Sequence, residues 1–189
     1  MRIIAGTAGR TAIKVPPAVT RPTTDFVRQA VFSILGERVA DARVLDLYAG
    51  SGALGLESLS RGAKSCTFVE DHRQAVKVIV ENLAKARLEG GYAVKSEVTP
   101  FIKRDAGTYD LIFADPPYWK YHGDKDHITE LLNSGLLPPR LAAGGWIIVE
   151  IGSHQTSPVA DGFLLVARRE YGNSAILIYT ANAVGVSGE

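Results

Sequence analysis

The stretch Val44-Leu45-Asp46-Leu47-Tyr48-Ala49-Gly50-Ser51-Gly52-Ala53-Leu54-Gly55 decides the fold, because an apolar run leads directly into a glycine-rich turn. It predicts a buried strand over 44–48, a tight turn that the glycines allow, and a helix over about 53–61. The same alternation continues downstream, with strands expected over 65–70, 92–96, 110–114 and 146–151 and helices over 73–88, 99–104 and 126–134. Such alternation is typical of a parallel sheet with right-handed crossovers.

The two ends of the chain complete this architecture. Residues 1–23 are punctuated by glycine and proline and indicate an N-terminal basic arm, and helical periodicity begins at Thr24. Two apolar runs over 163–170 and 175–180 have no helix between them, so they predict a hairpin at one edge of the sheet. We therefore expect a single α/β, Rossmann-like domain over 24–189: a seven-stranded, mostly parallel sheet with a C-terminal antiparallel hairpin and helices on both faces.

Charge is distributed unevenly along the chain. The net charge is +1, but residues 1–43 carry seven Lys or Arg against three acids, and the remainder carries fourteen against seventeen. A basic front suits contact with a polyanion, although chance asymmetry explains it equally well. No apolar run approaches the roughly 18 residues that span a bilayer, and no signal peptide is evident, so we expect a cytoplasmic protein. With Cys66 as the only cysteine and no histidines at ligand spacing, neither a disulfide nor a metal site is expected.

The glycine turn predicts a small-molecule ligand, since such sheets bind ligands at the carboxyl ends of their strands. Free N–H groups at the start of the next helix suit a carboxylate or a phosphate, and the glycine spacing alone fits a dinucleotide. Asp46 favours a ligand with an ammonium group over a dinucleotide, because a carboxylate there repels a pyrophosphate but accepts hydrogen bonds from an ammonium. S-adenosylmethionine has an ammonium and a carboxylate on its methionine end. The sequence therefore favours a methionine-type ligand, held by Asp46, Tyr48, Ala49, Gly50 and Gly52.

Two further carboxylates follow predicted strands. Glu70 ends the second strand, twenty residues beyond Gly50, where a carboxylate can accept hydrogen bonds from both hydroxyls of a ribose. This interpretation holds for either class of ligand. Glu97 follows the third strand and is a candidate to accept from an adenine amino group, although a glutamate in that position is more often simply solvated.

The motif Asp115-Pro116-Pro117-Tyr118 directly follows the fourth predicted strand. Two prolines stiffen the turn and remove two N–H donors, so the motif offers acceptors only. An exocyclic amine on an aromatic ring is a poor nucleophile, because its lone pair is delocalised. Hydrogen bonds accepted by Asp115 and the Pro116 carbonyl would favour a pyramidal nitrogen that attacks a methyl group in line. Tyr118 would stack on a base that has been flipped out.

Residues 119–125 interleave aromatic and basic side chains, among them Lys120. Such a loop can clamp a nucleotide by stacking and phosphate contact, and a flexible solvated lid fits the pattern equally well.

Together these residues resemble the class I S-adenosylmethionine methyltransferases that act on amino groups. The chain termini narrow the resemblance. Arg2-Ile3-Ile4-Ala5-Gly6, Thr20-Arg21-Pro22-Thr23-Thr24-Asp25 and Tyr171-Gly172-Asn173-Ser174-Ala175 are similar to the RsmD family, bacterial methyltransferases of guanine N2 in 16S ribosomal RNA. The similarity covers essentially the whole chain.

The resemblance implies a function for each motif. Asp46, Gly50, Gly52 and Glu70 would hold S-adenosylmethionine, the segment containing Thr23 would lie over it, and Asp115–Tyr118 would receive the guanine. The family's basic arm meets RNA, which here implies contacts by Arg10, Arg21 and Arg28, and Lys120 of the loop at 119–125 is a further expected RNA contact. The substrate would be 16S ribosomal RNA within the small subunit or an assembly intermediate, bound by a monomer. Two departures are visible: the family's Asp-Arg-Val-Arg-Glu run reads Asp-Phe-Val-Arg-Gln at 25–29, and Glu97 replaces its usual aspartate.

Other functions remain open at this level. An adenine-N6 methyltransferase of DNA or RNA would share the Asp115 motif, and a protein glutamine methyltransferase acts on a similarly conjugated nitrogen. A non-catalytic RNA-binding assembly factor could keep the fold, although the intact motif argues against it. An NAD-linked dehydrogenase would bind nicotinamide and give Asp115 no role.

Overall fold

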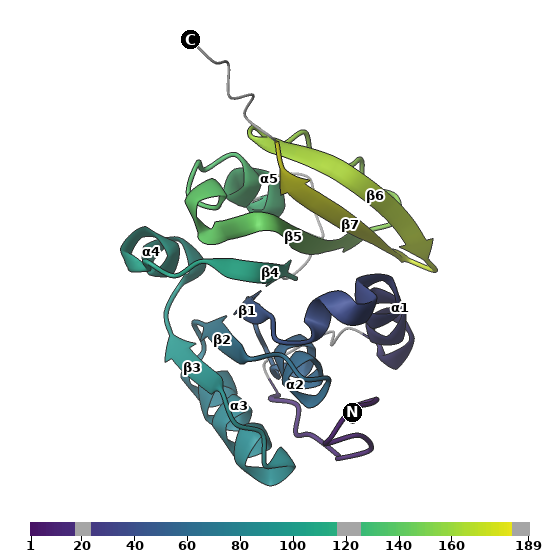
Figure 1. The fold of residues 1–189 in the computed structure, drawn as a ribbon, viewed down its shortest axis with the longest axis vertical. Coiled ribbons are helices and arrows are strands. Elements are labelled where there is room, and N and C mark those ends of the chain that lie inside the picture. The colour runs from purple at the N-terminus through teal and green to yellow at the C-terminus, as the bar shows by residue number, and fades with distance from the viewer. Residues whose placement is uncertain (18–23, 117–125, 183–189) are drawn as a thin grey trace.

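A computed structural model describes residues 1–17, 24–116 and 126–182. Its centre is one seven-stranded sheet in the order β3-β2-β1-β4-β5-β7-β6 (Figure 1). The strands are β1 (Arg43–Leu47), β2 (Ser65–Glu70), β3 (Gly91–Lys95), β4 (Tyr109–Ala114), β5 (Leu141–Gly152), β6 (Phe163–Tyr171) and β7 (Ser174–Ala181). Neighbours from β3 to β5 pair in parallel, and β7 pairs antiparallel with both β5 and β6. The predicted fold, including the terminal hairpin, is confirmed.

Helices cover both faces of the sheet. They are α1 (Asp25–Leu35), α2 (Ala53–Ser60), α3 (Arg73–Ala86), α4 (Val98–Arg104) and α5 (His127–Leu132), with short 3-10 turns η1 (Gly36–Val39) and η2 (Pro138–Arg140). Thr24 caps α1, because its hydroxyl accepts a hydrogen bond from the N–H of Val27. Observed boundaries agree with those expected to within a few residues, except that β5 begins at Leu141. There, a register shift against β4 adds an irregular first half that hydrophobic patterning did not reveal.

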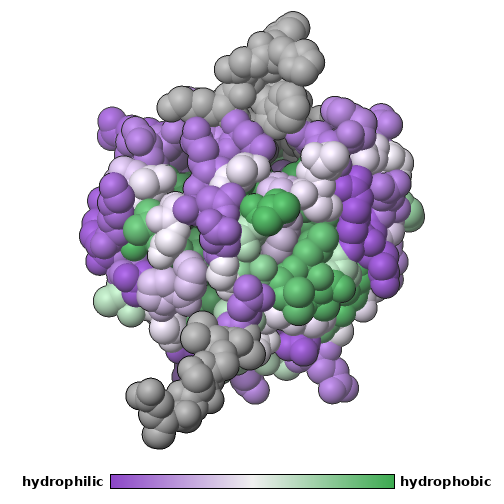
Figure 2. All heavy atoms as spheres, turned by 90° about the horizontal axis from the view of Figure 1, so that it is seen from above, coloured by the Kyte–Doolittle hydropathy of each residue, from purple (hydrophilic) through white to green (hydrophobic). Residues whose placement is uncertain are grey.

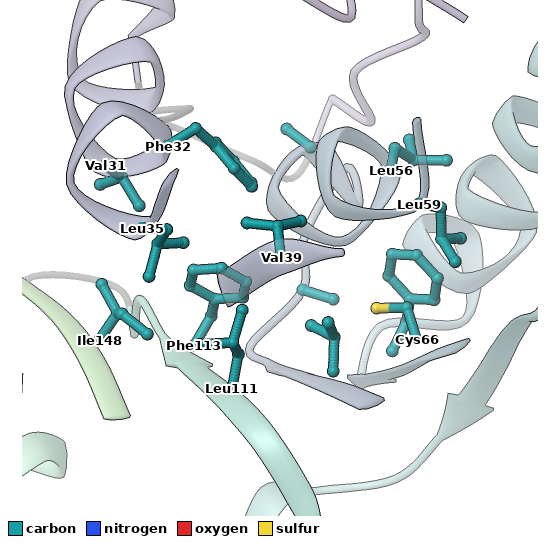
Figure 3. Packing of buried hydrophobic residues seen from close by; sticks show 14 of the residues in the cluster. Val31, Phe32, Leu35, Val39, Leu56, Leu59, Cys66, Leu111, Phe113 and Ile148 are labelled. Atoms are coloured by element: carbon teal, nitrogen blue, oxygen red, sulfur yellow. The ribbon is translucent and has the colours of Figure 1, made fainter. Parts of the chain in front are cut away.

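Alternate residues of each strand divide the core in two. One cluster contains Phe113 and Ile148 and packs against α1, α2 and α3, and the other contains Ile112 and Val149 and packs against α4 and α5. Figure 3 shows side chains of α1 meeting Phe113 and Ile148 on the first of these faces. Helix α1 is therefore an integral layer of the domain, lying over the β4 and β5 region of the sheet.

The first seventeen residues pack onto the same face as α1. The buried carboxylate of Glu57 in α2 accepts hydrogen bonds from the N–H groups of Ile4 (2.7 Å) and Ala5 (3.1 Å). Further along, the N–H of Lys14 donates to the Asn82 side chain of α3 at 2.8 Å. The described portion of the N-terminal arm is thus anchored along its length, while the predicted boundary at residue 23 lies outside the described residues.

Strand β6 forms an edge of the sheet and carries an exposed apolar run. Leu164, Leu165 and Val166 are 58%, 38% and 48% exposed. Figure 2, which views the molecule from the β6 end, shows an apolar area surrounded by polar side chains. The pairing with β7 shifts register between Leu165 and Ala167, so Val166 occupies a bulge, a feature that disfavours further edge-to-edge pairing.

Candidate active site

The strand order reverses between β1 and β4, whose carboxyl ends lie side by side. The chain moves outward from β1 through β2 to β3 and then returns to place β4 on the other side of β1. Ligands of open α/β sheets bind at such a switch point. Leu47 pairs with Ala114, so the residues that follow both strands emerge at the same edge. These are the glycine turn and Asp115, which the sequence singled out independently.

The turn after β1 depends on left-handed backbone conformations. Tyr48, Gly50 and Gly52 have φ angles of 58°, 54° and 77°. Glycine adopts such angles without steric cost, and Tyr48 is a rarer, non-glycine case. The N–H of Gly52 donates to the carbonyl of Ala49 at 2.7 Å, which closes the turn immediately before α2 begins. The half-buried Tyr48 ring lies 6.3 Å from the ring of His127 on α5.

Asp46 lies beneath this turn and is only 2% exposed. Its Oδ2 accepts a hydrogen bond from the N–H of Gly55 at 3.0 Å, which ties the first turn of α2 to β1. Burial raises the pKa of Asp46 to about 8, opposed by the Gly55 hydrogen bond and reinforced by the nearby carboxylates of Asp115 and Glu70. Three acidic groups therefore converge at the switch point, and a cation bound there would relieve their mutual repulsion.

Glu70 holds the glycine turn from the neighbouring strand. Its Oε2 accepts from the N–H of Gly50 and its Oε1 accepts from the N–H of His72, both at 2.8 Å. Partial burial is the main reason that its pKa is raised, with Asp71 contributing further. Sequence reasoning assigned Glu70 to a ligand and missed this contact with the turn. Each carboxylate oxygen has a second lone pair, so the ribose interaction remains compatible with the geometry.

Asp115 and Pro116 follow β4 at the edge of a hollow. The hollow is bounded by α1, α2 and three neighbouring strands, and its lining residues are Val31, Leu54, Phe113, Ala114, Asp115, Ile148, Glu150 and Ile176. Glu150 was not among the sequence predictions, because a single glutamate inside a long apolar strand gives no motif. The predicted Pro117, Tyr118 and Lys120 lie outside the described residues.

Of the predicted RNA contacts, Arg10 and Arg28 lie among the described residues, as does Glu97, the predicted contact with adenine. Arg10 is exposed on the anchored N-terminal segment, and Glu97 is exposed directly after β3 as the residue that precedes α4. Arg21 and Thr23 lie outside the described residues.

Arg28 does not occupy the exposed position that an RNA contact requires. Its side chain is fully buried, and its Nη2 donates to the carbonyl of Arg2 and to Oδ1 of Asp25, both at 2.7 Å. The other two guanidinium nitrogens have no hydrogen-bond partner within the part of the chain that the structure describes. The direct RNA contact that the family resemblance implied for Arg28 does not fit this position, because the N-terminal segment covers this face of α1.

Comparison with known proteins agrees with this arrangement. A sequence model of the family described as "Conserved hypothetical protein 95" matches residues 1–180. The chain belongs to this family. The chain is also similar to the "Putative rRNA methyltransferase YlbH" of Bacillus subtilis, at 34% identity over 95% of this chain and 98% of that protein. The "Ribosomal RNA small subunit methyltransferase D" of Escherichia coli K12 is 33% identical over 86% of this chain and 77% of the relative.

Solved structures extend the similarity to three dimensions. The "Putative methyltransferase yhhF from Escherichia coli" superposes with a TM-score of 0.84 at 30% identity, covering 97% of this chain and 98% of that one. The family resemblance predicted from the terminal motifs is confirmed, and the chain is a methyltransferase. Among the described residues, no helix is long and apolar enough to cross a membrane, and no group of three or more His, Cys, Asp or Glu is arranged to hold a metal ion.

Proposed function

We propose that the chain transfers a methyl group from S-adenosylmethionine to the exocyclic N2 of a guanine in 16S ribosomal RNA. The observation that carries this proposal is the position of Asp115, which lies close enough to Asp46 to raise its pKa and lines a largely apolar hollow. The names of the family's relatives, a small-subunit ribosomal RNA methyltransferase among them, support ribosomal RNA as the substrate class.

The residues at the switch point fit the cofactor. When bound, S-adenosylmethionine supplies an electrophilic methyl group on a positively charged sulfonium. A positively charged group bound beside Asp46 and Glu70 would lower the raised pKa values of both carboxyl groups, so that their ionised forms pair with the cofactor's charge. The left-handed φ angles at Gly50 and Gly52 set the shape of the turn that would face the ligand, and they are angles that glycine adopts without steric cost. Glu97 is assigned to the adenine amino group, and Thr23 to the segment over the cofactor.

The groups that act on the target nitrogen are hydrogen-bond acceptors. The Asp115 carboxylate and the Pro116 carbonyl accept hydrogen bonds from the two N–H groups of the amine, which aims its lone pair at the methyl group. A strong base is not required, because the nitrogen becomes acidic as it gains the methyl group. Pro117 stiffens the turn, and Tyr118 stacks on the flipped base.

The N-terminal segment provides the RNA-facing end. Arg10 is exposed there, and the ion pair between Arg2 and Asp25 leaves the Arg2 side chain 67% exposed. Arg21 and Lys120 complete the proposed contacts, whereas Arg28 supports them only by anchoring α1. In this arrangement residues 1–23 act as an arm on a single methyltransferase domain, and the enzyme works as a monomer on the small subunit or its assembly intermediate.

The test uses small ribosomal subunits that lack the modification, radiolabelled S-adenosylmethionine, and mass-spectrometric mapping of the labelled base. Wild-type enzyme should label N2 of one guanine. Asp115→Asn should abolish transfer and leave cofactor affinity within a few-fold. Asp110→Asn is the matched control and should stay active, because Asp110 lies on the strand that Asp115 follows but pairs with Arg43 at the amino ends of β4 and β1. Full activity of Asp115→Asn, or label on DNA or protein alone, would overturn the proposal.

A further inference from the structure

Glu150 stands beside Asp115 on the neighbouring strand. Ala114 of β4 pairs in parallel with Val149 of β5, so the next step in the same register brings Asp115 and Glu150 together. Adjacent strands lie about 4.8 Å apart, within the span of one nucleobase edge. Pleating alternates side chains, and Phe113 and Ile148 point toward α1 (Figure 3), so Asp115 and Glu150 share that face.

Both carboxylates line one hollow whose other walls are apolar. Val31 comes from α1, Leu54 from α2, and Ile176 from β7, where it pairs with Glu150. Glu150 is only 9% exposed. The two carboxylates are the polar groups of this hollow, and an ionised carboxylate accepts hydrogen bonds without donating any.

Nucleobases differ in whether their edges can satisfy two adjacent acceptors. Guanine presents N1–H beside its N2 amine, so two contiguous positions donate. Adenine and cytosine present an amine beside a ring nitrogen with a lone pair, which a second carboxylate would repel. A flipped base is read through this edge, and a site built around hydrogen bonds strongly rejects analogues that leave its groups unpaired.

We propose that Glu150 is the specificity-determining residue that accepts the N1–H of the target guanine while Asp115 accepts from its N2 amine. This inference rests on the proposed function and adds the reason that the base is guanine rather than adenine. Four lone-pair positions on the Glu150 carboxylate allow it to accept this hydrogen bond alongside others.

The test separates the reacting amine from the neighbouring N–H. The target guanosine, located by the mapping experiment, is replaced by 2-aminopurine in reconstituted subunits. 2-Aminopurine keeps the 2-amino group but has a lone pair at N1. Wild-type enzyme should prefer guanosine by on the order of 10²-fold or more in kcat/KM. Glu150→Gln, whose amide can donate to N1, should lose most of that preference, whereas Glu150→Asp should keep it at a lower rate.

Glu89→Gln is the control, because Glu89 is exposed near the amino end of β3, away from the hollow. An unchanged preference in Glu150→Gln, or an equal loss with both bases, would overturn the assignment of specificity. Thermal unfolding and cofactor binding verify that each variant is folded. If Glu150→Gln does not fold, Glu150→Asp decides the question by itself. Loss of the preference for guanosine in Glu150→Asp would then refute the proposal. Failure of the wild-type enzyme to label guanine would instead refute the proposed function.

Discussion

Replacing Asp46 with asparagine should make the unliganded protein more stable at alkaline pH. The pKa of Asp46 is raised from 3.8 to about 8, chiefly by burial. Between these two values the folded state holds a proton that the unfolded state has lost, so the free energy of unfolding falls as pH rises. The slope approaches about 1.4 kcal/mol per pH unit for one proton. This contribution is fully present below about pH 4 and is lost above about pH 8.

Asparagine removes the titration and keeps the shape. Its Oδ1 can accept the hydrogen bond that Gly55 donates to Asp46, so the tie to α2 survives. Urea unfolding of both proteins from pH 5 to 9 should give curves that diverge, with the variant more stable by a few kcal/mol at pH 9. The matched control is Asp110→Asn. The pKa of Asp110 is lowered by its hydrogen bonds with Arg43, so Asp110 is ionised in both the folded and the unfolded state from pH 5 to 9. The free energy of unfolding of Asp110→Asn should therefore differ from that of the wild type by a constant amount, with the same dependence on pH.

Parallel curves for wild type and Asp46→Asn would refute the reasoning, since they would mean that Asp46 is ionised in the folded protein throughout the range. The same carboxylate makes a linked prediction for binding. An ammonium placed near Asp46 would lower its pKa, so cofactor binding near pH 7 should release a proton from the wild type and none from the variant. Calorimetry in two buffers of different ionisation enthalpy measures that proton.

Two other substitutions test how the site is built. Glu57→Gln should destabilise the protein by about 3 kcal/mol, because a buried carboxylate that binds the N–H of Ile4 and pairs with Arg61 at 2.7 Å would lose its charge; an unchanged urea midpoint would contradict that role. Gly55→Ala should cost about 1–3 kcal/mol, because its Cβ would lie 2.2 Å from Cε1 of Phe68 and force α2 away from β2; thermal unfolding at the wild-type temperature would argue against it.

The sequence by itself determined the strands, most helices and the two principal motifs. Those features are local: strand and helix periodicity, the glycine pair at 50 and 52, and the Asp115 turn each lie within a few consecutive residues. The convergence of the motifs at one end of the strands was also accessible, because parallel crossovers bring the carboxyl ends to one edge. Terminal motifs were specific enough to indicate the family that the comparisons confirmed.

Only the tertiary structure decided which side chains share an environment. Asp115 and Glu150 are thirty-five positions apart, and their juxtaposition depends on the register between β4 and β5. Arg28 looked like a surface cation in a basic segment, yet the N-terminal segment and α1 bury it together. No pattern in the sequence singles out Glu57, whose buried carboxylate accepts hydrogen bonds from the N–H groups of Ile4 and Ala5. Periodicity assigns a residue to a face, whereas its partners are set by packing between distant segments.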